Sequence, residues 1–453
     1  MPAEQDQLLQ ATGTRFKLYP QAPVLAAFAE PETVWVSQRP DTIQPGPADD
    51  RLYVVEPIDK PRPYEFPYLP PYRGPTRAAV GPGRDGHFDH LEPGDPGFEA
   101  AHMYGTVRRV LDIWEAYFGR SIPWHFRDRF ERLELIPFVD WDNAQSGYGF
   151  IEVGYGEAES GARHPYSLNF DVLAHEFGHS LIFSEVGVPT PATMTAEYRG
   201  FQESASDLVA LVAVLHFDTV VDRVLRNSNG DLYTLNELNR IGELSETEQI
   251  RLACNSLRMS DVADVMTPAE QLSQPELHRL GEPLTGAIFD IFVEVYQELL
   301  VDAGLIDAEL AALSYGAPED GAPLASIERR FAAAYRDRHD AFKEVLLRAR
   351  DYLGALLANT WMRIPRHLLS FRDVSMALLA SDLSLTGGRY RQIIRGSLAW
   401  REITLPTMGG RSALFTGRDL ASLELGLAVR KSRHLRSLPY RERWRLAMRR
   451  ERF

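Results

Sequence analysis

The segment His175-Glu176-Phe177-Gly178-His179 constrains the fold more than any other stretch of this chain. Apolar residues surround it, and their spacing predicts a buried helix. Residues four apart lie on one face of a helix, so both imidazoles can bind one tetrahedral ion while Glu176 projects beside its open position. Two histidines and a carboxylate on a buried helix are costly unless something pairs with them. The segment therefore indicates a metal site of the kind found in metallopeptidases.

A zinc ion needs a third protein ligand, and its place in the chain separates the classes of zinc peptidase. The metzincin pattern would require Gly at 182 and His at 185, but the chain has Ile182 and Glu185, so that class is excluded. Further on, Glu203 and Asp207 are four apart at the start of a second apolar segment, so they share a helix face. We predict that Glu203 is the third ligand and that Asp207 accepts the spare ring N–H of a ligating histidine. A solvent-exposed acidic face is the alternative, but the neighbouring residues are too apolar for it.

Together the two motifs resemble the gluzincin zinc peptidases of the thermolysin and fungalysin type. The likeness rests on His175-Glu-Phe-Gly-His179 followed by Gly-x-x-Glu203-x-x-Ser206-Asp207, with weaker likenesses in the same order over roughly residues 95 to 404. It implies a zinc metalloendopeptidase with one zinc ion held by His175, His179 and Glu203, and with Glu176 as general base. The acidic cluster that binds paired calcium ions (Ca2+) in thermolysin has no clear counterpart after Asp207, so calcium is doubtful.

The resemblance also assigns residues outside the metal site. Leu257 to Asp261 is similar to the segment that carries the arginine for the substrate carbonyl, which implies Arg258. His278 stands where the family keeps its transition-state histidine. An aspartate orients this histidine in the family; here Ser273 occupies the nearest comparable place, and Glu276 is a candidate substitute for the aspartate. The alternatives are a surface ion pair with Asp261 for Arg258 and a helix-capping or solvated role for His278.

The segment Asp142-Asn143-Ala144-Gln145 resembles the family's substrate-edge strand. The resemblance implies that Asn143 and Ala144 hydrogen-bond a peptide that is added as an extra strand. The expected partner is therefore a peptide or protein in extended conformation.

The expected fold class is α+β. It is a two-lobed zincin-like catalytic domain with a mixed sheet-and-helix N-terminal lobe, a mainly helical C-terminal lobe and an active-site cleft between them. The predicted regions are a Pro/Gly-rich arm with short strands (residues 1–95), a mixed lobe ending in the zinc helix (96–185), a mainly helical lobe (186–404) and a basic tail (405–453). A proline-rich ligand for a partner protein is the alternative for the arm.

Charge and hydropathy add limits. The formal net charge is −14, yet the stretch from Arg430 to Phe453 holds ten Arg or Lys residues against two Glu. We predict that this tail docks on the chain's own acidic body, and an anionic partner is the alternative. No apolar run approaches the ~20 residues of a membrane span, and the start of the chain lacks a secretory signal, so a cytoplasmic protein is expected, with non-classical export left open.

Two other functions stay open at this stage. One is a catalytically weak gluzincin-like binding protein, because the orienting aspartate is missing before His278. The other is another zinc hydrolase such as an aminopeptidase, although the Gly-x-Met-Glu-Asn element that would hold a free amine is absent.

Overall fold

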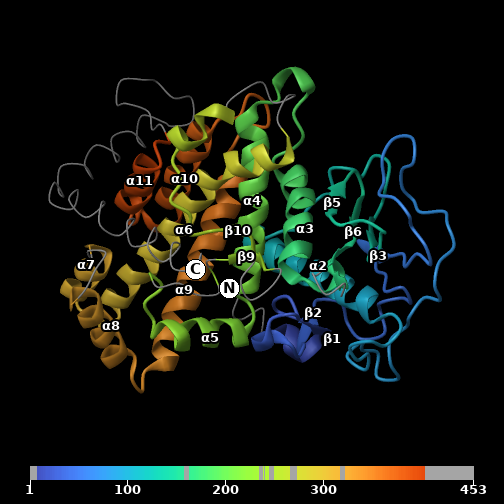
Figure 1. Ribbon diagram of the computed structural model, residues 1–453, viewed down its shortest axis with the longest axis horizontal. Coiled ribbons are helices and arrows are strands. Elements are labelled where there is room, and N and C mark those ends of the chain that lie inside the picture. Colours follow the sequence, from blue (N-terminus) through green and yellow to red (C-terminus); the bar gives the residue numbers. More distant parts are fainter. Residues whose placement is uncertain are drawn as a thin grey trace. The chain divides into compact units, whose positions relative to one another are not determined.

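A computed structural model of the chain describes residues 8–157, 163–233, 238, 240–243, 249–265, 273–316 and 322–403. These residues form a mixed α/β protein of long helices and short strands (Figure 1), which confirms the predicted mixture of helix and sheet. The chain divides into two compact units. Unit 1 takes the described residues of Met1–Val188, Ala205–Phe217 and Arg240–Leu252, and unit 2 takes those of Pro189–Ser204, Asp218–Asn239 and Ala253–Phe453. The basic tail predicted at 405–453 lies outside the described residues.

Within the described ranges, every β-strand belongs to unit 1. Its strands are β1 Thr14–Leu18, β2 Glu32–Val36, β3 Leu52–Val54, β4 Leu133–Ile136, β5 Ala144–Gly147, β6 Phe150–Val153, β7 Tyr155–Glu157, β8 Arg163–Pro165, β9 Arg240–Glu243 and β10 Gln249–Leu252. Its helices are η1 Ala26–Phe28, α2 Phe98–Phe118, η2 Tyr166–Leu168 and α3 Phe170–Glu185. The predicted arm and the predicted mixed lobe thus contribute to the same compact unit.

The main sheet of unit 1 has the strand order β3-β4-β6-β5. Strands β3, β4 and β6 are parallel, and β5 runs antiparallel to β6. Every residue of β4 and β6 is buried, as expected for parallel strands that are covered on both faces. The two-residue turn Tyr148-Gly149 joins β5 to β6, and Gly149 has a φ of 89°, which favours glycine there. Because β5 is the last strand in this order, it forms an edge of the sheet, as expected from the segment 142–145.

Two helices carry the predicted metal ligands. The side chain of Asn169 accepts a hydrogen bond from the Val172 N–H at 3.2 Å and so caps the start of α3. Helix α4 (Ala196–Val214) is one continuous helix whose residues up to Ser204 belong to unit 2 and whose remainder belongs to unit 1. A Cβ atom on Gly178 would lie 2.7 Å from the Cα of Ser206, so glycine allows α3 and α4 to approach closely.

The described part of unit 2 is helical. Its elements are η3 Pro191–Thr193, α5 Asp218–Ser228, η5 Met259–Val265, α6 Gln274–Asp302, α7 Ala308–Gly316, α8 Ala322–Tyr335, α9 His339–Trp361, α10 Phe371–Thr386 and α11 Arg391–Trp400. Helix α6 packs against α9 and α11, and α9 packs against α10. Among all the described residues, in both units, no helix is long and apolar enough to cross a membrane.

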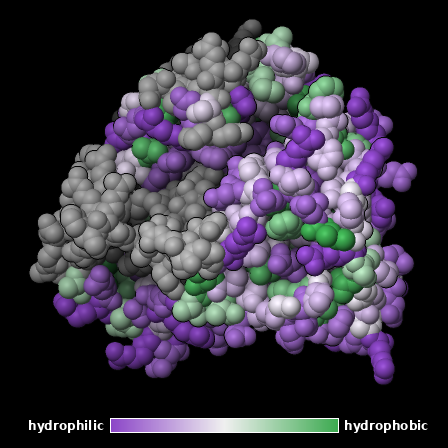
Figure 2. All heavy atoms as spheres, turned by 45° about the vertical axis from the view of Figure 1, so that its right-hand side comes forward, coloured by the Kyte–Doolittle hydropathy of each residue, from purple (hydrophilic) through white to green (hydrophobic). Residues whose placement is uncertain are grey.

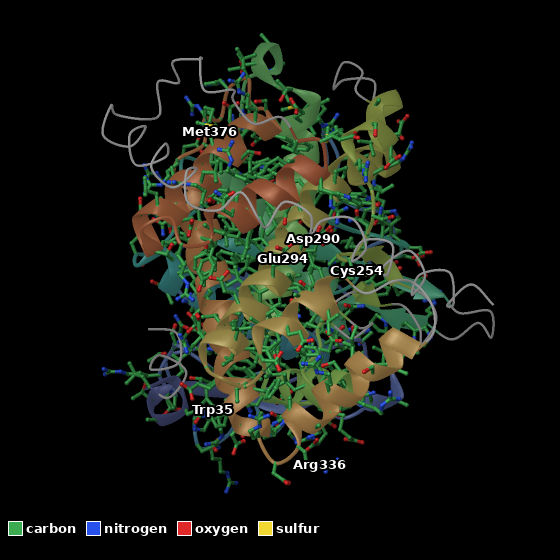
Figure 3. All side chains as sticks on the ribbon, turned by 90° about the vertical axis from the view of Figure 1, so that its left-hand side faces the viewer. Trp35, Cys254, Asp290, Glu294, Arg336 and Met376 are labelled. Atoms are coloured by element: carbon green, nitrogen blue, oxygen red, sulfur yellow. The ribbon has the colours of Figure 1, made fainter. Side chains whose placement is uncertain are left out.

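The buried side chain of Arg401 holds the loop that precedes η5. The Arg401 guanidinium donates hydrogen bonds to Asp290 Oδ2 at 3.0 Å, to Asn255 Oδ1 at 2.8 Å and to the Leu257 carbonyl at 2.8 Å. Figure 3 labels Asp290 and also Cys254, the neighbour of Asn255. A Cβ atom on Gly286 would lie 2.6 Å from this guanidinium, so glycine makes room for it.

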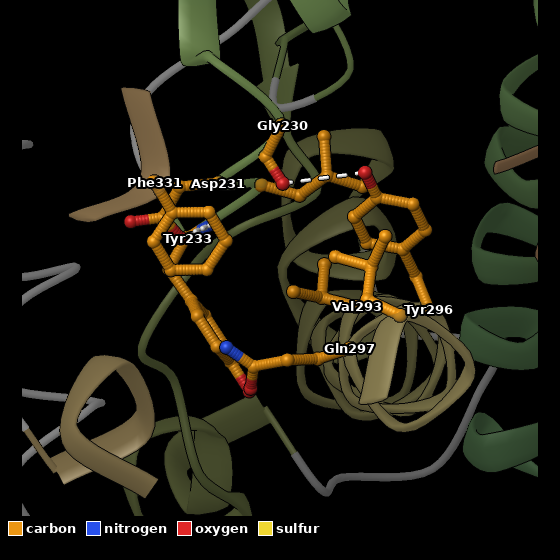
Figure 4. A pocket seen from close by; sticks show the side chains of 9 residues that line it. Gly230, Asp231, Tyr233, Val293, Tyr296, Gln297 and Phe331 are labelled. Carbon is orange, nitrogen blue, oxygen red and sulfur yellow. Dashed lines mark hydrogen bonds between the residues drawn. The ribbon is translucent and has the colours of Figure 1, made fainter. Parts of the chain in front are cut away.

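A narrow gap with no room for a water molecule lies against α6 in unit 2 (Figure 4). The Tyr296 hydroxyl crosses one side of it and donates to the Gly230 carbonyl at 3.2 Å. Most of its lining is apolar core, including Val293, Leu300 and Phe331. On the face drawn in Figure 2, hydrophobic residues form scattered spots among hydrophilic ones, as on most protein surfaces.

Candidate metal centre

The ligand atoms of His175, His179 and Glu203 lie within 4.8 Å of one another. Both histidines come from α3 and Glu203 comes from α4, which approaches α3 at Gly178. His175 is buried, Glu203 is only 7% exposed and His179 is partly exposed. The three residues predicted as ligands are therefore brought together by the close packing of two helices.

Asp207 lies one helical turn after Glu203 and contacts His175. Its Oδ1 atom is 2.8 Å from His175 Nδ1, and both side chains are buried. A carboxylate can only accept a hydrogen bond, so His175 donates its Nδ1–H and its Nε2 carries a lone pair. That lone pair faces His179, because the two Nε2 atoms are 3.2 Å apart.

This donor set fits a zinc ion. Two zinc–nitrogen bonds at a tetrahedral angle would hold the nitrogen atoms about 3.3 Å apart, close to the 3.2 Å separation of the two Nε2 atoms. A carboxylate oxygen from Glu203 completes a set of three protein ligands and leaves one position open. Glu176 follows His175 on α3 and is partly exposed.

His278 lies on α6 and contacts the same carboxylate. Its Nε2 atom is 2.8 Å from Glu203 Oε2, and its side chain is 33% exposed. A Cβ on Gly281 would lie 2.6 Å from the Gly200 carbonyl oxygen, so a glycine pair lets α6 approach α4. Thr285 Oγ1 also donates to Ser204 Oγ at 2.9 Å. The structure thus brings His278 together with Glu203.

The residues before His278 cap the helix. The Ser273 N–H donates to Glu276 Oε2 at 2.7 Å, and the Ser273 hydroxyl lies 2.5 Å from the same oxygen. These contacts form a capping box at the start of α6. The Glu276 carboxylate, which is the candidate substitute for the orienting aspartate, therefore accepts hydrogen bonds from Ser273 at the N-terminus of α6.

The Arg258 side chain contacts Trp400 and Glu402. Its guanidinium lies 4.4 Å from the centre of the Trp400 ring and 3.8 Å from Glu402 Oε1. Its backbone N–H, and not its side chain, contacts Asp261, at 2.9 Å from Oδ2. Among the described residues the Arg258 side chain makes no hydrogen bond or ion pair with His278 or Glu203. The alternative considered for Arg258 was a surface ion pair with Asp261. The structure instead pairs its side chain with Glu402.

Asn143 and Ala144 lie at the start of β5. Asn143 is exposed, and its Oδ1 accepts a hydrogen bond from the Ala144 N–H at 2.9 Å. Strand β5 lies beside α3, because Ser146 Oγ is 2.8 Å from Ser180 Oγ. The sheet edge therefore runs next to the helix that carries both histidines.

The sequence did not reveal what holds β5 in place. Gln145 Nε2 donates to Glu152 Oε1 at 2.6 Å and to the Tyr64 carbonyl at 3.0 Å. Lys60 Nζ lies 2.5 Å from Glu152 Oε2, and both side chains are fully buried. Burial lowers the pKa of Lys60, and the Glu152 carboxylate opposes that shift. Alternation along the strand puts Gln145 and Ser146 on opposite faces, and this is the sequence signal that could have indicated the anchor.

No protein-family model matches the chain, and no curated protein matches it either. The chain is similar to a solved structure described as the precursor of protealysin, a metalloproteinase from Serratia proteamaculans. The sequences are 13% identical, the match covers 67% of this chain and 88% of that chain, and the TM-score is 0.35. A likeness of this size establishes no function for this chain.

Proposed function

We propose that the protein is a zinc-dependent metalloendopeptidase of the gluzincin type, with its ion held by His175, His179 and Glu203. The observation that carries the proposal is the convergence of these three donors within 4.8 Å, with His175 oriented by Asp207. A zinc ion bound there supplies a water of lowered pKa and polarises the scissile carbonyl.

The chain's own residues would move the protons. Glu176 would take a proton from the attacking water and deliver it to the leaving amine. Asp207 would keep His175 in the tautomer whose Nε2 binds the metal. His278, beside Glu203, would donate a hydrogen bond to the oxyanion that develops on the substrate, a contribution of about 3 kcal/mol in comparable sites. Arg258 could add a second donor only if its side chain left Glu402.

The substrate in this proposal is a peptide in extended conformation. Strand β5 is at the edge of its sheet and beside the histidine helix, so an added strand would pass close to the metal ligands. Asn143 and Ala144 would hydrogen-bond its backbone at one end of the strand.

The test is the Glu176→Gln variant, with zinc content and peptide hydrolysis measured on the same samples. About one zinc per chain should remain, and hydrolysis should fall by about 10²- to 10⁴-fold. The control is Glu131→Gln, an exposed acid outside the site, which should behave as wild type. Hydrolysis that persists in Glu176→Gln would contradict the general-base role, and unchanged zinc in His179→Ala or Glu203→Ala would contradict the ligand set.

A catalytically weak binding protein is the second candidate. The observation that favours it is the capping contact of Glu276, which occupies the carboxylate expected to orient His278. A zinc-loaded wild type that binds extended peptides but cleaves no member of a diverse peptide library would establish it.

A further inference from the structure

The edge strand β5 lacks the large apolar side chains that usually hold a strand in place. It consists of Ala144, Gln145, Ser146 and Gly147, and all four residues are partly exposed. It pairs with β6 on one side, and it lies beside α3 (Figure 1). Burial of apolar surface specifies the position of such a polar, glycine-containing strand only weakly. The place of β5 therefore depends on its turn and on specific polar contacts.

One carboxylate supplies the contact on the face of β5 that is turned away from α3. Gln145 lies directly opposite Glu152 of β6 in the strand register, and its Nε2 atom donates to Glu152 Oε1 at 2.6 Å. The Tyr64 N–H donates to the same oxygen at 2.6 Å. Lys60 Nζ lies 2.5 Å from the other oxygen, Oε2. The Glu152 carboxylate thus connects β5 with the segment 60–64.

This carboxylate needs a cation beside it. The side chains of Lys60 and Glu152 are fully buried, and a buried carboxylate without a partner is costly. Lys60 Nζ also lies 3.9 Å from the centre of the Tyr64 ring and 5.3 Å from that of the Tyr68 ring. A buried ion pair often adds no stability over apolar side chains of similar size. What this pair adds is an oxygen that accepts a hydrogen bond from Gln145.

We propose that Glu152, with Lys60 as its counter-ion, is a positioning residue that holds β5 where a peptide added to its open edge lies in line with the zinc ligands. The inference rests on the proposed function and adds to it a residue that touches neither substrate nor metal. The contact lies near the end of β5 where Asn143 and Ala144 would bind the peptide. A shift of about 1 Å there would misplace the scissile bond, which can reduce a rate by about 100-fold.

Two double variants separate the hydrogen-bond acceptor from the charge. Lys60→Met with Glu152→Met removes the ion pair without leaving a buried charge, and Gln145 loses its acceptor. Lys60→Met with Glu152→Gln also removes both charges, but the amide oxygen can accept the same hydrogen bond. The first variant should lower kcat for a hexapeptide by about 10- to 100-fold with little change in KM. The second should recover most of this loss.

Substrate length distinguishes positioning from general damage. A blocked dipeptide pairs with little of β5, so its kcat should change by less than about twofold in both variants. Zinc content and thermal unfolding are measured on the same samples, because a loosened protein would lose zinc and would cleave both substrates more slowly. Equal losses for the dipeptide and the hexapeptide, or no loss for the hexapeptide, would overturn the positioning role.

The matched control removes another ion pair of the same unit. Lys17 and Glu92 form a partly exposed pair outside the site. Lys17→Met with Glu92→Met should therefore cleave both substrates at the wild-type rate. A loss for the hexapeptide in this control as large as that in Lys60→Met with Glu152→Met would count against a specific role of Glu152.

A distance measurement tests the inference without catalysis. Cobalt(II) replaces zinc in the Glu176→Gln protein, and its effect on the NMR relaxation of a fluorine-labelled hexapeptide reports the distance from the metal to the bound peptide. This distance should increase when Lys60→Met and Glu152→Met are added, and it should return with Lys60→Met and Glu152→Gln. That result supports the positioning role even if wild type cleaves nothing.

The other outcomes separate this inference from the proposed function. An unchanged distance would overturn the positioning role and leave the peptidase proposal to the zinc and hydrolysis measurements on Glu176→Gln. A hexapeptide that neither binds to the metal-loaded protein nor is cleaved by it would overturn both.

Discussion

Asp207 shows how a residue can be placed from sequence before any contact is known. Its spacing of four from Glu203 puts both acids on one helix face, and the structure gives it the His175 contact that this spacing predicts. His278 was placed by resemblance alone, and no spacing argument predicts that it lies 2.8 Å from Glu203. The contacts of Arg258 with Trp400 and Glu402 could not be predicted, because these residues lie more than a hundred positions away.

Removal of the Asp207 carboxylate should weaken zinc binding. In Asp207→Ala the Nδ1–H of His175 loses its acceptor, so zinc affinity should fall by about 10- to 100-fold. Asp207→Asn keeps an acceptor oxygen and should lose less. Competition with a chromophoric chelator measures both, and circular dichroism verifies that the variants are folded. Unchanged affinity in Asp207→Ala would show that the contact does not support the metal site.

At the scale of elements, two glycine contacts position the site. Gly178 allows α3 to approach α4, and the pair Gly200 and Gly281 allows α6 to approach α4. The helices themselves were predictable from apolar spacing and capping signals, because both are local properties of the sequence. The closeness of their packing was not, since a glycine inside a motif does not reveal which backbone lies opposite it.

Gly178→Ala should separate α3 from α4. The added Cβ would lie 2.7 Å from the Ser206 Cα, a backbone atom that cannot turn aside, so the free energy of unfolding should fall by about 1–3 kcal/mol and zinc affinity should fall with it. Urea unfolding and chelator competition measure the two effects. In the control, Gly396→Ala on α11, the new methyl group meets nothing within 4 Å and should leave stability equal or raised by about 0.5–1 kcal/mol. Equal effects in the two variants would argue against a specific contact at Gly178.

At the scale of the molecule, the assembly of each unit from separate stretches of chain escapes sequence reasoning. The boundaries of the predicted regions followed composition along the chain. Each compact unit instead consists of three ranges that are separate in sequence and are joined by long-range contacts. A long-range contact inside the range Met1–Val188 of unit 1 passes through His102 on α2, which is fully buried. It accepts a hydrogen bond from the Tyr19 N–H at 3.0 Å and contacts the Ser167 carbonyl through Nδ1 at 2.8 Å. This histidine therefore joins the β1 region to the segment that leads into α3.

Stability should fall as the pH falls below 7. Burial lowers the pKa of His102 to about 4, so the unfolded chain, with a histidine pKa of about 6.5, binds the proton more readily. Between pH 7 and pH 5 this residue should cost about 2 kcal/mol of the free energy of unfolding. In His102→Gln that part of the pH dependence should be absent, while His90→Gln, at an exposed position, should keep it. Urea unfolding at both pH values gives the comparison, and equal slopes in wild type and His102→Gln would refute the assignment.

The passage of the chain from one unit to the other inside α4 has a consequence for inheritance. Glu203 precedes the crossing point and Asp207 follows it, so a gene fragment that encoded the residues of one unit alone would cut the helix between them. Recombination that exchanged one unit alone would therefore separate Glu203 from Asp207, the residue that orients His175. The stretch from His175 to Asp207 is the shortest continuous piece of chain that carries the three donors and the acid that orients His175.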